Sequence, residues 1–358
     1  MKTVLNAKKI LLIKLRHHGD VLLSTPVASA LKTAAPDCRI DLLLYKETRP
    51  IVEHNPDYTR IWTIDRSRKG LKRLLDLAAL ATRLRRERYD LIVHLSDQSL
   101  GALLTRWSRP RRAIGFDYPK RRNSTWARCF DALAPVADSD SLHTVEQNLL
   151  ALSPLGLDVP VAAKRCKMAY SEQDRLTVQA KLHALGVTTP YIAVHPASRW
   201  FFKCWEDERF AAVVQALADK GWHVVLTAAP VAQEEALVRS ILDRVDSERV
   251  HSLAGQLTLT SLAALIDGAR LFIGVDSVPM HMAAALGRDT VALFGPSKVN
   301  EWRPWMTRHT LIHAADYGPL IDPDAVDTGT SERYLSNIPV DAVLDAAQAL
   351  LAAEEPAR

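Results

Sequence analysis

Short apolar runs alternate with stretches of helical spacing along most of the chain. In the first part, four apolar runs predict buried strands at 9–15, 39–44, 59–64 and 89–95. Helical patterns lie between them at 26–34, after a Gly19-Asp20 turn, and at 70–88, where the pattern is basic and amphipathic. Apolar strands separated by helices are typical of a parallel sheet covered on both faces.

The pattern weakens between about residues 136 and 171 and then restarts. Further strands are predicted at 191–195, 222–227, 249–253, 271–275 and 290–294. Helices are predicted between them at 206–220, 234–245, 258–267 and 280–286. The sequence therefore predicts an α/β protein built from two Rossmann-like, doubly wound domains that face a cleft.

The weakly patterned stretch sets the expected domain boundary, with 156–169 as a connector rich in Val, Pro and Lys. We expect an N-terminal domain over 1–170 and a C-terminal domain over 171–335. The last segment, 336–358, contains a predicted helix at 339–352. Its apolar residues share one face, so this helix should pack back on the body of the protein.

Composition narrows the class of protein. The chain of 358 residues is 48% hydrophobic and 24% charged, which indicates a globular protein and excludes a disordered or fibrous one. The aliphatic stretch nearest the start, 10–13, is too short to cross a bilayer. Charge follows this stretch and no cleavage site is present, so it does not match a signal peptide, and we expect a cytoplasmic protein. Four cysteines without a CxxC pair argue against a zinc site and a disulfide framework.

The net charge of +5 conceals an asymmetry between the two halves. Residues 1–130 contain 27 Lys and Arg against 12 Asp and Glu, whereas residues 131–358 contain 19 against 29. A basic first half suggests an anionic partner such as nucleic acid, anionic lipid or a phosphorylated glycan. Charge alone does not choose among them.

Ligands of open α/β sheets bind beyond the carboxyl ends of the strands, so the residues after each strand are candidates for chemistry. Asp20 follows the first strand, near the start of a helix. Its carboxylate could cap that helix, because Asp is a favoured N-cap residue, or it could act as a general base. The chain has no GxGxxG and no Walker sequence, which argues against a dinucleotide site and a P-loop.

The predicted strand at 271–275 leads into Asp276 and Ser277, with His281 one helical turn later. Ser277 suits an N-cap and Pro279 suits the first turn of the following helix. The free N–H groups and the positive dipole end of such a helix form an anion site suited to a diphosphate. His281 is then either a packed core histidine or a neighbour of the bound anion.

Two more strand ends carry polar groups. After the strand at 191–195, Ser198, Arg199 and Lys203 could bind phosphate oxygens or belong to an ordinary solvated loop. After the strand at 222–227, Glu234 or Glu235 could bind the hydroxyl pair of a ribose. The alternative for these glutamates is that they complement the dipole at a helix start.

Together these residues resemble a known family. Gly19-Asp20, the loop from Ser198 to Trp205 and Asp276-Ser277-x-x-x-His281 are similar to the family 9 glycosyltransferases, the ADP-heptose:lipopolysaccharide heptosyltransferases. The resemblance runs from Ile10 to Leu351, and its most specific part is the Asp-Ser-x-x-x-His element. The segments 294–297 with 302–305, and 316–319 with 329–331, resemble the heptosyltransferase III subgroup.

The resemblance implies a GT-B fold and an inverting transfer of L-glycero-D-manno-heptose from ADP-L-glycero-β-D-manno-heptose. The acceptor is implied to be the inner core of lipopolysaccharide, with the third heptose placed on heptose II. Asp20 resembles the family's general base, and Lys203 resembles the residue that takes up the charge of the leaving ADP. The residues similar to the family's donor site are Ser198, Lys203, Glu234 (with Glu235 as the alternative), Asp276, Ser277 and His281.

No cofactor and no obligatory metal are expected, because no Asp-x-Asp pair stands at a strand end and Lys203 with the Ser277 helix start can take the developing charge. We expect a monomer at the cytoplasmic face of the inner membrane of a Gram-negative cell, in peripheral contact with that membrane and without a nucleic-acid partner. The candidate acceptor contacts in the basic half are Arg60, Arg111, Arg112 and Arg121. These four and the further cations Arg66, Lys72, Arg73 and Arg122 could meet either the anionic acceptor or the inner-leaflet surface. The alternative for each is a solvated basic face.

Three other functions fit parts of the pattern. A sugar-nucleotide epimerase also uses two Rossmann-like halves, but would act without an acceptor. A nucleic-acid-binding module is suggested by charge alone, and no RNP, KH or helix-turn-helix pattern accompanies it. A different family 9 transferase, with another core acceptor or another ADP-sugar, is the nearest alternative.

Overall fold

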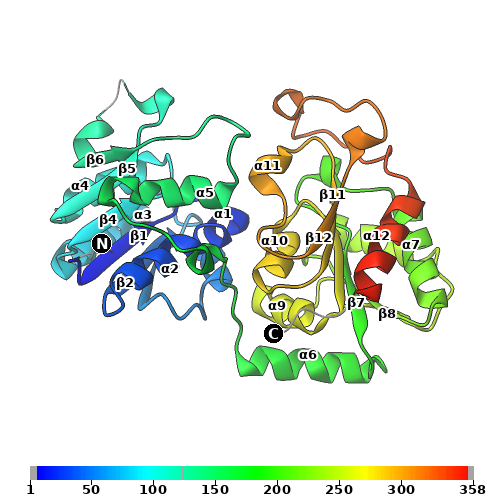
Figure 1. Cartoon of the computed structure of the whole chain (residues 1–358). Coiled ribbons are helices and arrows are strands. Elements are labelled where there is room, and N and C mark those ends of the chain that lie inside the picture. The colour runs from blue at the N-terminus through cyan, green and yellow to red at the C-terminus, as the bar shows by residue number, and fades with distance from the viewer. Residues whose placement is uncertain (1–5, 123–124, 354–358) are drawn as a thin grey trace. The chain divides into compact units, whose positions relative to one another are not determined.

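The computed structural model describes residues 6–122 and 125–353. The chain divides into two compact units, residues 1–169 and 170–358, called unit 1 and unit 2 below. Each unit is a twisted parallel sheet with helices on its faces (Figure 1).

Unit 1 contains a six-stranded parallel sheet in the order β3-β2-β1-β4-β5-β6. Its strands are β1 Lys9–Ile13, β2 Arg39–Tyr45, β3 Arg60–Ile64, β4 Leu91–His94, β5 Arg112–Phe116 and β6 Ala132–Ala134. Its helices are α1 His18–Leu22, α2 Thr25–Ala34, α3 Gly70–Glu87, α4 Ser99–Ser108 and α5 Thr144–Leu149. In the central strands Leu12 lies opposite Leu42 and Val93, and all three are fully buried, as strands covered on both faces require.

Unit 2 repeats this topology with the order β12-β11-β10-β7-β8-β9. Its strands are β7 Tyr191–His195, β8 His223–Leu226, β9 Val250–Ser252, β10 Leu271–Val275, β11 Thr290–Phe294 and β12 His309–His313. Its helices are α6 Glu172–Ala184, α7 Asp207–Asp219, α8 Ala232–Leu242, α9 Leu259–Gly268, α10 Val278–Ala285, α11 Val299–Trp302 and α12 Val340–Ala352. The last of these packs against α7 and the sheet, with Val343, Ala347 and Leu350 in the core.

Counted along the chain, both units order their strands third, second, first, fourth, fifth, sixth, which is the doubly wound Rossmann arrangement. The predicted fold class is therefore confirmed in each unit. One local prediction is wrong: Gly19 and Asp20 do not form a turn but belong to helix α1, which begins at His18 after the four residues that follow β1.

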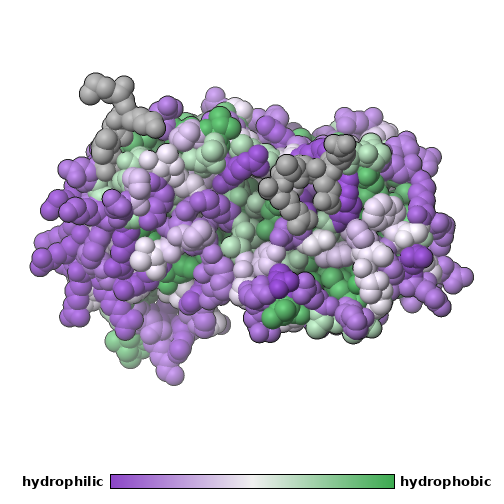
Figure 2. All heavy atoms as spheres, turned by 60° about the horizontal axis from the view of Figure 1, so that its bottom comes forward, coloured by the Kyte–Doolittle hydropathy of each residue, from purple (hydrophilic) through white to green (hydrophobic). Residues whose placement is uncertain are grey.

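The surface of both units is mainly hydrophilic, with small hydrophobic patches on the face that Figure 2 presents. Among the described residues, no helix combines the length and the apolar content needed to cross a bilayer.

Candidate active site

The strand order of each sheet defines where a ligand crevice opens. In a doubly wound sheet the chain leaves the first and the fourth strand in opposite directions, and the crevice between these connections binds ligands. In unit 1 these strands are β1 and β4, and in unit 2 they are β7 and β10. Asp20 follows β1, whereas Ser198 and Asp276 follow β7 and β10.

A buried ion pair occupies the crevice of unit 2. The Lys203 ammonium donates to Oδ2 of Asp276 at 2.5 Å, and the Ser297 hydroxyl donates to the same oxygen at 2.7 Å. Asp276 follows β10, Ser297 follows β11, and Lys203 ends a short 3₁₀ helix after β7. Three loops at one edge of the sheet therefore converge on a single carboxylate.

The electrostatics of this cluster favour the ionised form of Asp276. Burial alone would raise the pKa of Asp276, but the Lys203 ammonium and the neighbouring His281 hold this pKa below its ordinary value. The ionised carboxylate keeps the lysine side chain at the crevice instead of letting it extend into solvent. Lysine has three N–H donors, so its ammonium can bind a further anion besides Asp276.

Helix α10 begins beside this ion pair. Ser277 is its N-cap, as predicted, but the hydroxyl makes no capping hydrogen bond. The Ser277 Oγ is buried and finds no hydrogen-bond partner among the described residues. A buried hydroxyl and the first N–H groups of a helix thus stand next to Lys203, which is a favourable arrangement for an anion. His281 is buried one turn along the helix, and its ring lies 6.1 Å from that of Trp302.

The loop that carries Lys203 is packed and not simply solvated. Phe202 is buried and stacks with Trp200, which remains partly exposed. The Lys203 ammonium lies 5.1 Å from the centre of the Trp200 ring. Ser198 is also buried, and its carbonyl faces the Cys204 thiol. The aromatic residues of this loop fix the position of the lysine.

Glu234 and Glu235 lie in the first turn of α8, at the same edge of the unit 2 sheet. The Glu234 Oε2 accepts the backbone N–H of Ala229 at 2.9 Å, and burial raises the pKa of Glu234. The Glu235 carboxylate lies over Gly255, so close that a Cβ at residue 255 would be 2.5 Å from Oε1. Glu234 keeps one carboxylate oxygen for a ligand beside its backbone contact.

Asp20 lies in the crevice of unit 1, as the third residue of α1 and not as its N-cap, which is His17. Its carboxylate is 3.7 Å from the Arg16 guanidinium, and the same guanidinium is 3.8 Å from Asp97, which follows β4. Lys120 also pairs with Asp97. The helix-capping alternative is therefore wrong, and a carboxylate in a charged crevice remains.

Beneath this crevice lies the buried Lys14. Its ammonium donates to the carbonyl of Leu95 at 2.9 Å and to Oδ1 of Asn148 at 2.8 Å. Burial lowers the pKa of Lys14 to about 8, while the nearby charges of Asp20 and Asp97 act in the opposite direction. The charge of the buried Lys14 is thus coupled to the two carboxylates of the crevice.

The predicted acceptor arginines separate into two groups. Arg60 and Arg112 are the first residues of β3 and β5, and Arg111 immediately precedes β5. They lie at the amino ends of the strands, whereas Asp20 lies beyond a carboxyl end. A five-residue strand is about 16 Å long. The structure thus does not bring these three residues to Asp20, because they lie at the amino ends of the parallel strands and Asp20 lies at the carboxyl ends.

Arg121, in contrast, lies beyond the carboxyl end of β5. Its guanidinium donates to the carbonyl of Asp97 at 2.8 Å and stands 5.7 Å from the centre of the Trp126 ring. Of the four arginines singled out in the sequence, Arg121 is the one that the structure brings to the Asp20 crevice.

Several residues of these crevices are not apparent from the sequence reasoning. The sequence could have identified Lys14, because a charged residue inside the aliphatic run 10–15 stands out. The same holds for Asp97 and Ser297, since each closely follows a predicted strand. Their contacts with Arg16 and Asp276 join segments far apart in the chain, and only the strand order reveals them.

The Asp-x-Asp pairs at 138–140 and 322–324 gain no metal-binding partners in the fold. Within residues 6–122 and 125–353, no group of three or more His, Cys, Asp or Glu side chains is arranged to hold a metal ion.

Comparison with known proteins adds sequence relationships to this geometry. Residues 77–328 match glycosyltransferase family 9 (heptosyltransferase). The chain is 39% identical over 338 residues to lipopolysaccharide heptosyltransferase 3 of Escherichia coli, covering 94% of this chain and 97% of that protein. The corresponding protein of strain K12 is 37% identical over 343 residues, covering 96% and 98%.

Solved structures share the two-unit fold. A family 9 glycosyltransferase from Veillonella parvula superposes with a TM-score of 0.84 at 22% identity, over 98% of both chains. The E. coli heptosyltransferase WaaC, solved with ADP, superposes with a TM-score of 0.73 at 19% identity, over 96% of this chain and 99% of that one.

Proposed function

Since the chain belongs to glycosyltransferase family 9, the heptosyltransferases, we propose that it transfers L-glycero-D-manno-heptose from ADP-heptose to heptose II of the lipopolysaccharide inner core. The chain is a glycosyltransferase with the two-unit GT-B fold. This family membership argues against the epimerase and nucleic-acid alternatives. The structural observation that carries the proposal is the buried Lys203–Asp276 pair beside the start of α10.

In this proposal unit 2 binds the donor. The Lys203 ammonium, the Ser277 hydroxyl and the first N–H groups of α10 bind the diphosphate, and Asp276 positions Lys203. Ser198 and His281 line the same pocket, and Glu234 binds the ribose hydroxyls. Donors already in place around the β-phosphate stabilise the charge that develops on the leaving ADP.

Unit 1 supplies the acceptor side and the base. The acceptor hydroxyl oxygen forms a bond to the anomeric carbon of heptose while the bond from that carbon to the β-phosphate oxygen breaks. The hydroxyl proton passes to the Asp20 carboxylate, and ADP leaves with the electron pair. Attack from the side opposite to the leaving group inverts the anomeric configuration. The Asp20–Arg16–Asp97 cluster supports this assignment, because it offers a carboxylate at the crevice of the sheet.

We further propose that the enzyme works as a monomer without an obligatory metal, at the cytoplasmic face of the inner membrane and in peripheral contact with it. Arg121 contacts the anionic acceptor beside Asp20. Arg60, Arg111 and Arg112 contribute only through the positive potential of unit 1, because they lie at the far edge of its sheet.

The test is incubation with ADP-heptose and a series of core acceptors truncated at successive sugars, followed by mass spectrometry. We expect one heptose to be added to acceptors that end with heptose II exposed, with and without EDTA. Transfer to another core sugar instead would assign a different acceptor. ADP-heptose turnover without any acceptor would contradict the transferase mechanism, and a strict requirement for one divalent ion would contradict the metal-independent one.

A further inference from the structure

Helix α3 of unit 1 exposes three leucines at its start. Leu71, Leu74 and Leu75 are 72%, 64% and 60% exposed, whereas Leu80 and Leu84 are buried against the sheet. Leu71 precedes Leu80 by nine residues, or about two and a half helical turns, so the two side chains point to opposite sides of the helix. Neighbouring exposed leucines of this kind mark a surface that is covered in use.

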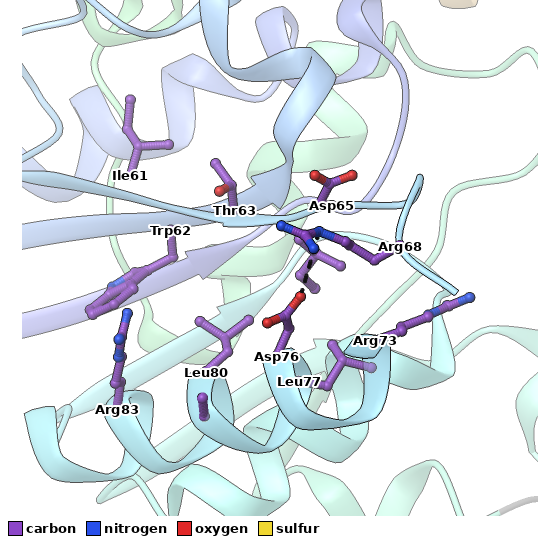
Figure 3. Close-up of a pocket in the computed structure, with 12 residues that line it drawn as sticks. Ile61, Trp62, Thr63, Asp65, Arg68, Arg73, Asp76, Leu77, Leu80 and Arg83 are labelled. Carbon is purple, nitrogen blue, oxygen red and sulfur yellow. Dashed lines mark ion pairs between the residues drawn. The ribbon is translucent and has the colours of Figure 1, made fainter. Parts of the chain in front are cut away.

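The charges around these leucines have one sign. Residues 66–86 contain eight Lys and Arg and a single acid, Asp76. The acid lies 3.9 Å from Arg68, in a pocket between β3 and α3. Figure 3 shows Arg68 and Asp76 facing each other there, while Arg73 extends away from the pocket. The ion pair leaves the charge of this segment strongly positive.

The neighbouring helix α4 exposes a second pair of apolar side chains, of which Trp107 lies beside the other end of α3. It packs against α3 and exposes Leu103 and Trp107, which are one turn apart and therefore on the same face. The guanidinium of Arg85, from α3, stands 5.8 Å from the centre of the Trp107 ring. Tryptophan and arginine side chains, which combine an apolar body with a polar end, suit the boundary between hydrocarbon and headgroups.

We propose that the start of α3, residues 68–75, docks on an anionic lipid bilayer, and we call this surface the α3 face. Its leucines enter the headgroup region, and Lys69, Lys72 and Arg73 meet lipid phosphates. A helix that combines leucines with cations and carries no acid between residues 66 and 75 matches an interfacial segment by charge complementarity. The inference rests on the proposed function, whose lipid-linked acceptor is held in a membrane.

Vesicle flotation of the full chain, without substrates, tests the α3 face. We expect binding to vesicles of phosphatidylcholine with about one third phosphatidylglycerol, weak binding to pure phosphatidylcholine, and loss of binding at high salt. Replacing Lys69, Lys72 and Arg73 with Gln should lower the partition coefficient about fivefold for each cation. The triple variant L71S/L74S/L75S should lower it by about tenfold or more.

The matched control is Leu176→Ser, which removes an exposed leucine from α6 in unit 2 and should leave binding unchanged. Vesicle binding that none of the α3 substitutions changes would overturn the proposal. A dimer in solution that dissociates in the leucine variant would overturn it too, because the α3 face would then cover a second copy of the chain.

A transfer assay separates this proposal from the proposed function. With a delipidated, water-soluble core acceptor, the leucine variant L71S/L74S/L75S should transfer heptose at the wild-type rate, and with the acceptor embedded in anionic vesicles it should be slower. If the wild type transfers no heptose to any acceptor but binds vesicles through the α3 face, the proposed function is contradicted and the proposed membrane surface is supported. Equal rates for variants and wild type on embedded acceptor, with unchanged flotation, would refute the surface alone.

Discussion

A single carboxylate defines the chemistry proposed for unit 1. Asp20 lies beyond the end of β1, partly exposed, with Arg16 as its neighbour in the crevice. If it removes the acceptor proton, Asp20→Asn should lower kcat by roughly 10²–10⁴-fold, since a general base contributes that much. Binding of ADP, measured by calorimetry, should stay unchanged because the donor residues belong to unit 2.

The control is Glu53→Gln, which removes an exposed carboxylate of unit 1 that pairs with Arg49. It should turn over normally. Near-normal turnover of Asp20→Asn would mean that this side chain serves only to hold Arg16.

The Lys203–Asp276 pair makes a different prediction, because removing one partner acts on both binding and stability. Lys203→Met should lower kcat/KM for ADP-heptose by roughly 10²-fold or more, as expected for the loss of a cation at the leaving diphosphate. It should also destabilise unit 2 by about 3–5 kcal/mol, since the Asp276 carboxylate is left buried without its cation.

Urea denaturation separates the two effects. The double variant Lys203→Met with Asp276→Asn should recover much of the stability, because no charge is buried, but none of the donor affinity. Recovery of donor use in that double variant would contradict the diphosphate role of Lys203.

At the residue scale, the sequence identifies the donor element well and the acceptor contacts poorly. Asp276 and Ser277 directly follow a strand that is apolar throughout, so their place at the sheet edge is determined locally. By charge, Arg60 and Arg112 look as suitable for the acceptor as Arg121. Whether such a residue lies at the amino or the carboxyl end of the strands depends on where its strand begins. The apolar pattern predicted β3 one residue early and did not predict β5.

At the scale of elements, helix α4 depends on a missing side chain. Gly101 faces the imidazole of His94 at the end of β4, and a Cβ at residue 101 would lie 2.0 Å from Nε2. The imidazole is buried between Trp126 and Phe130, so it has little room to move. Gly101→Ala should therefore destabilise unit 1 by roughly 1–3 kcal/mol through overpacking, which exceeds the gain of about 1 kcal/mol in helix propensity.

Thermal unfolding checks this prediction, with the pair of changes His94→Ala and Gly101→Ala as its control. Once the imidazole is gone, the added methyl group has space, so the two changes should be less destabilising together than the sum of each alone. A neutral or stabilising Gly101→Ala would show that α4 can move away from β4.

The strands whose bounds the sequence predicts best are buried along their whole length. Strands β7, β10 and β11 have the predicted bounds, since each is an apolar run buried along its whole length. Strand β12 was not predicted, because it lies at the edge of the sheet and only Ile312 of its five residues is buried. Strand β6 has three residues, too few for a period to be recognised.

At the scale of the whole molecule, we propose that the units divide the substrates, and the opposite charges of the two halves fit that division. Arg121 lies in the Asp20 crevice, so Arg121→Glu should raise the KM of the acceptor, by roughly tenfold or more for a lost charge-assisted contact, without changing ADP affinity. The double variant Arg111→Glu with Arg112→Glu is the matched control at the far edge of the sheet. It should have a smaller effect that disappears at high salt, because it acts only at a distance.

Steady-state kinetics at two salt concentrations distinguish the cases. If Arg111 and Arg112 prove to matter more than Arg121 at high salt, the acceptor crosses the amino edge of the sheet and the crevice assignment of unit 1 is wrong.

Both units also contain a buried histidine that should make the whole molecule sensitive to acid. His94 ends β4 in unit 1, and burial lowers its pKa to about 3; His195 ends β7 in unit 2, and burial lowers its pKa to about 4. In the unfolded chain both should titrate near 6.5. As the pH falls below that value, the unfolded chain gains protons that the folded chain refuses, so the free energy of unfolding decreases.

The expected loss is up to about 1.4 kcal/mol per pH unit for each histidine, or roughly 2 kcal/mol each between pH 7 and pH 5. Urea denaturation of wild type and His195→Gln at both pH values measures it for unit 2, and His94→Gln does so for unit 1. Each variant should lose less stability on acidification than the wild type, whatever its stability at pH 7, whereas the exposed His54→Gln should follow the wild type. Identical acid sensitivity in all four proteins would mean that both buried imidazoles take up protons in the folded state. That uptake would require water to reach the carboxyl ends of the strands in each sheet.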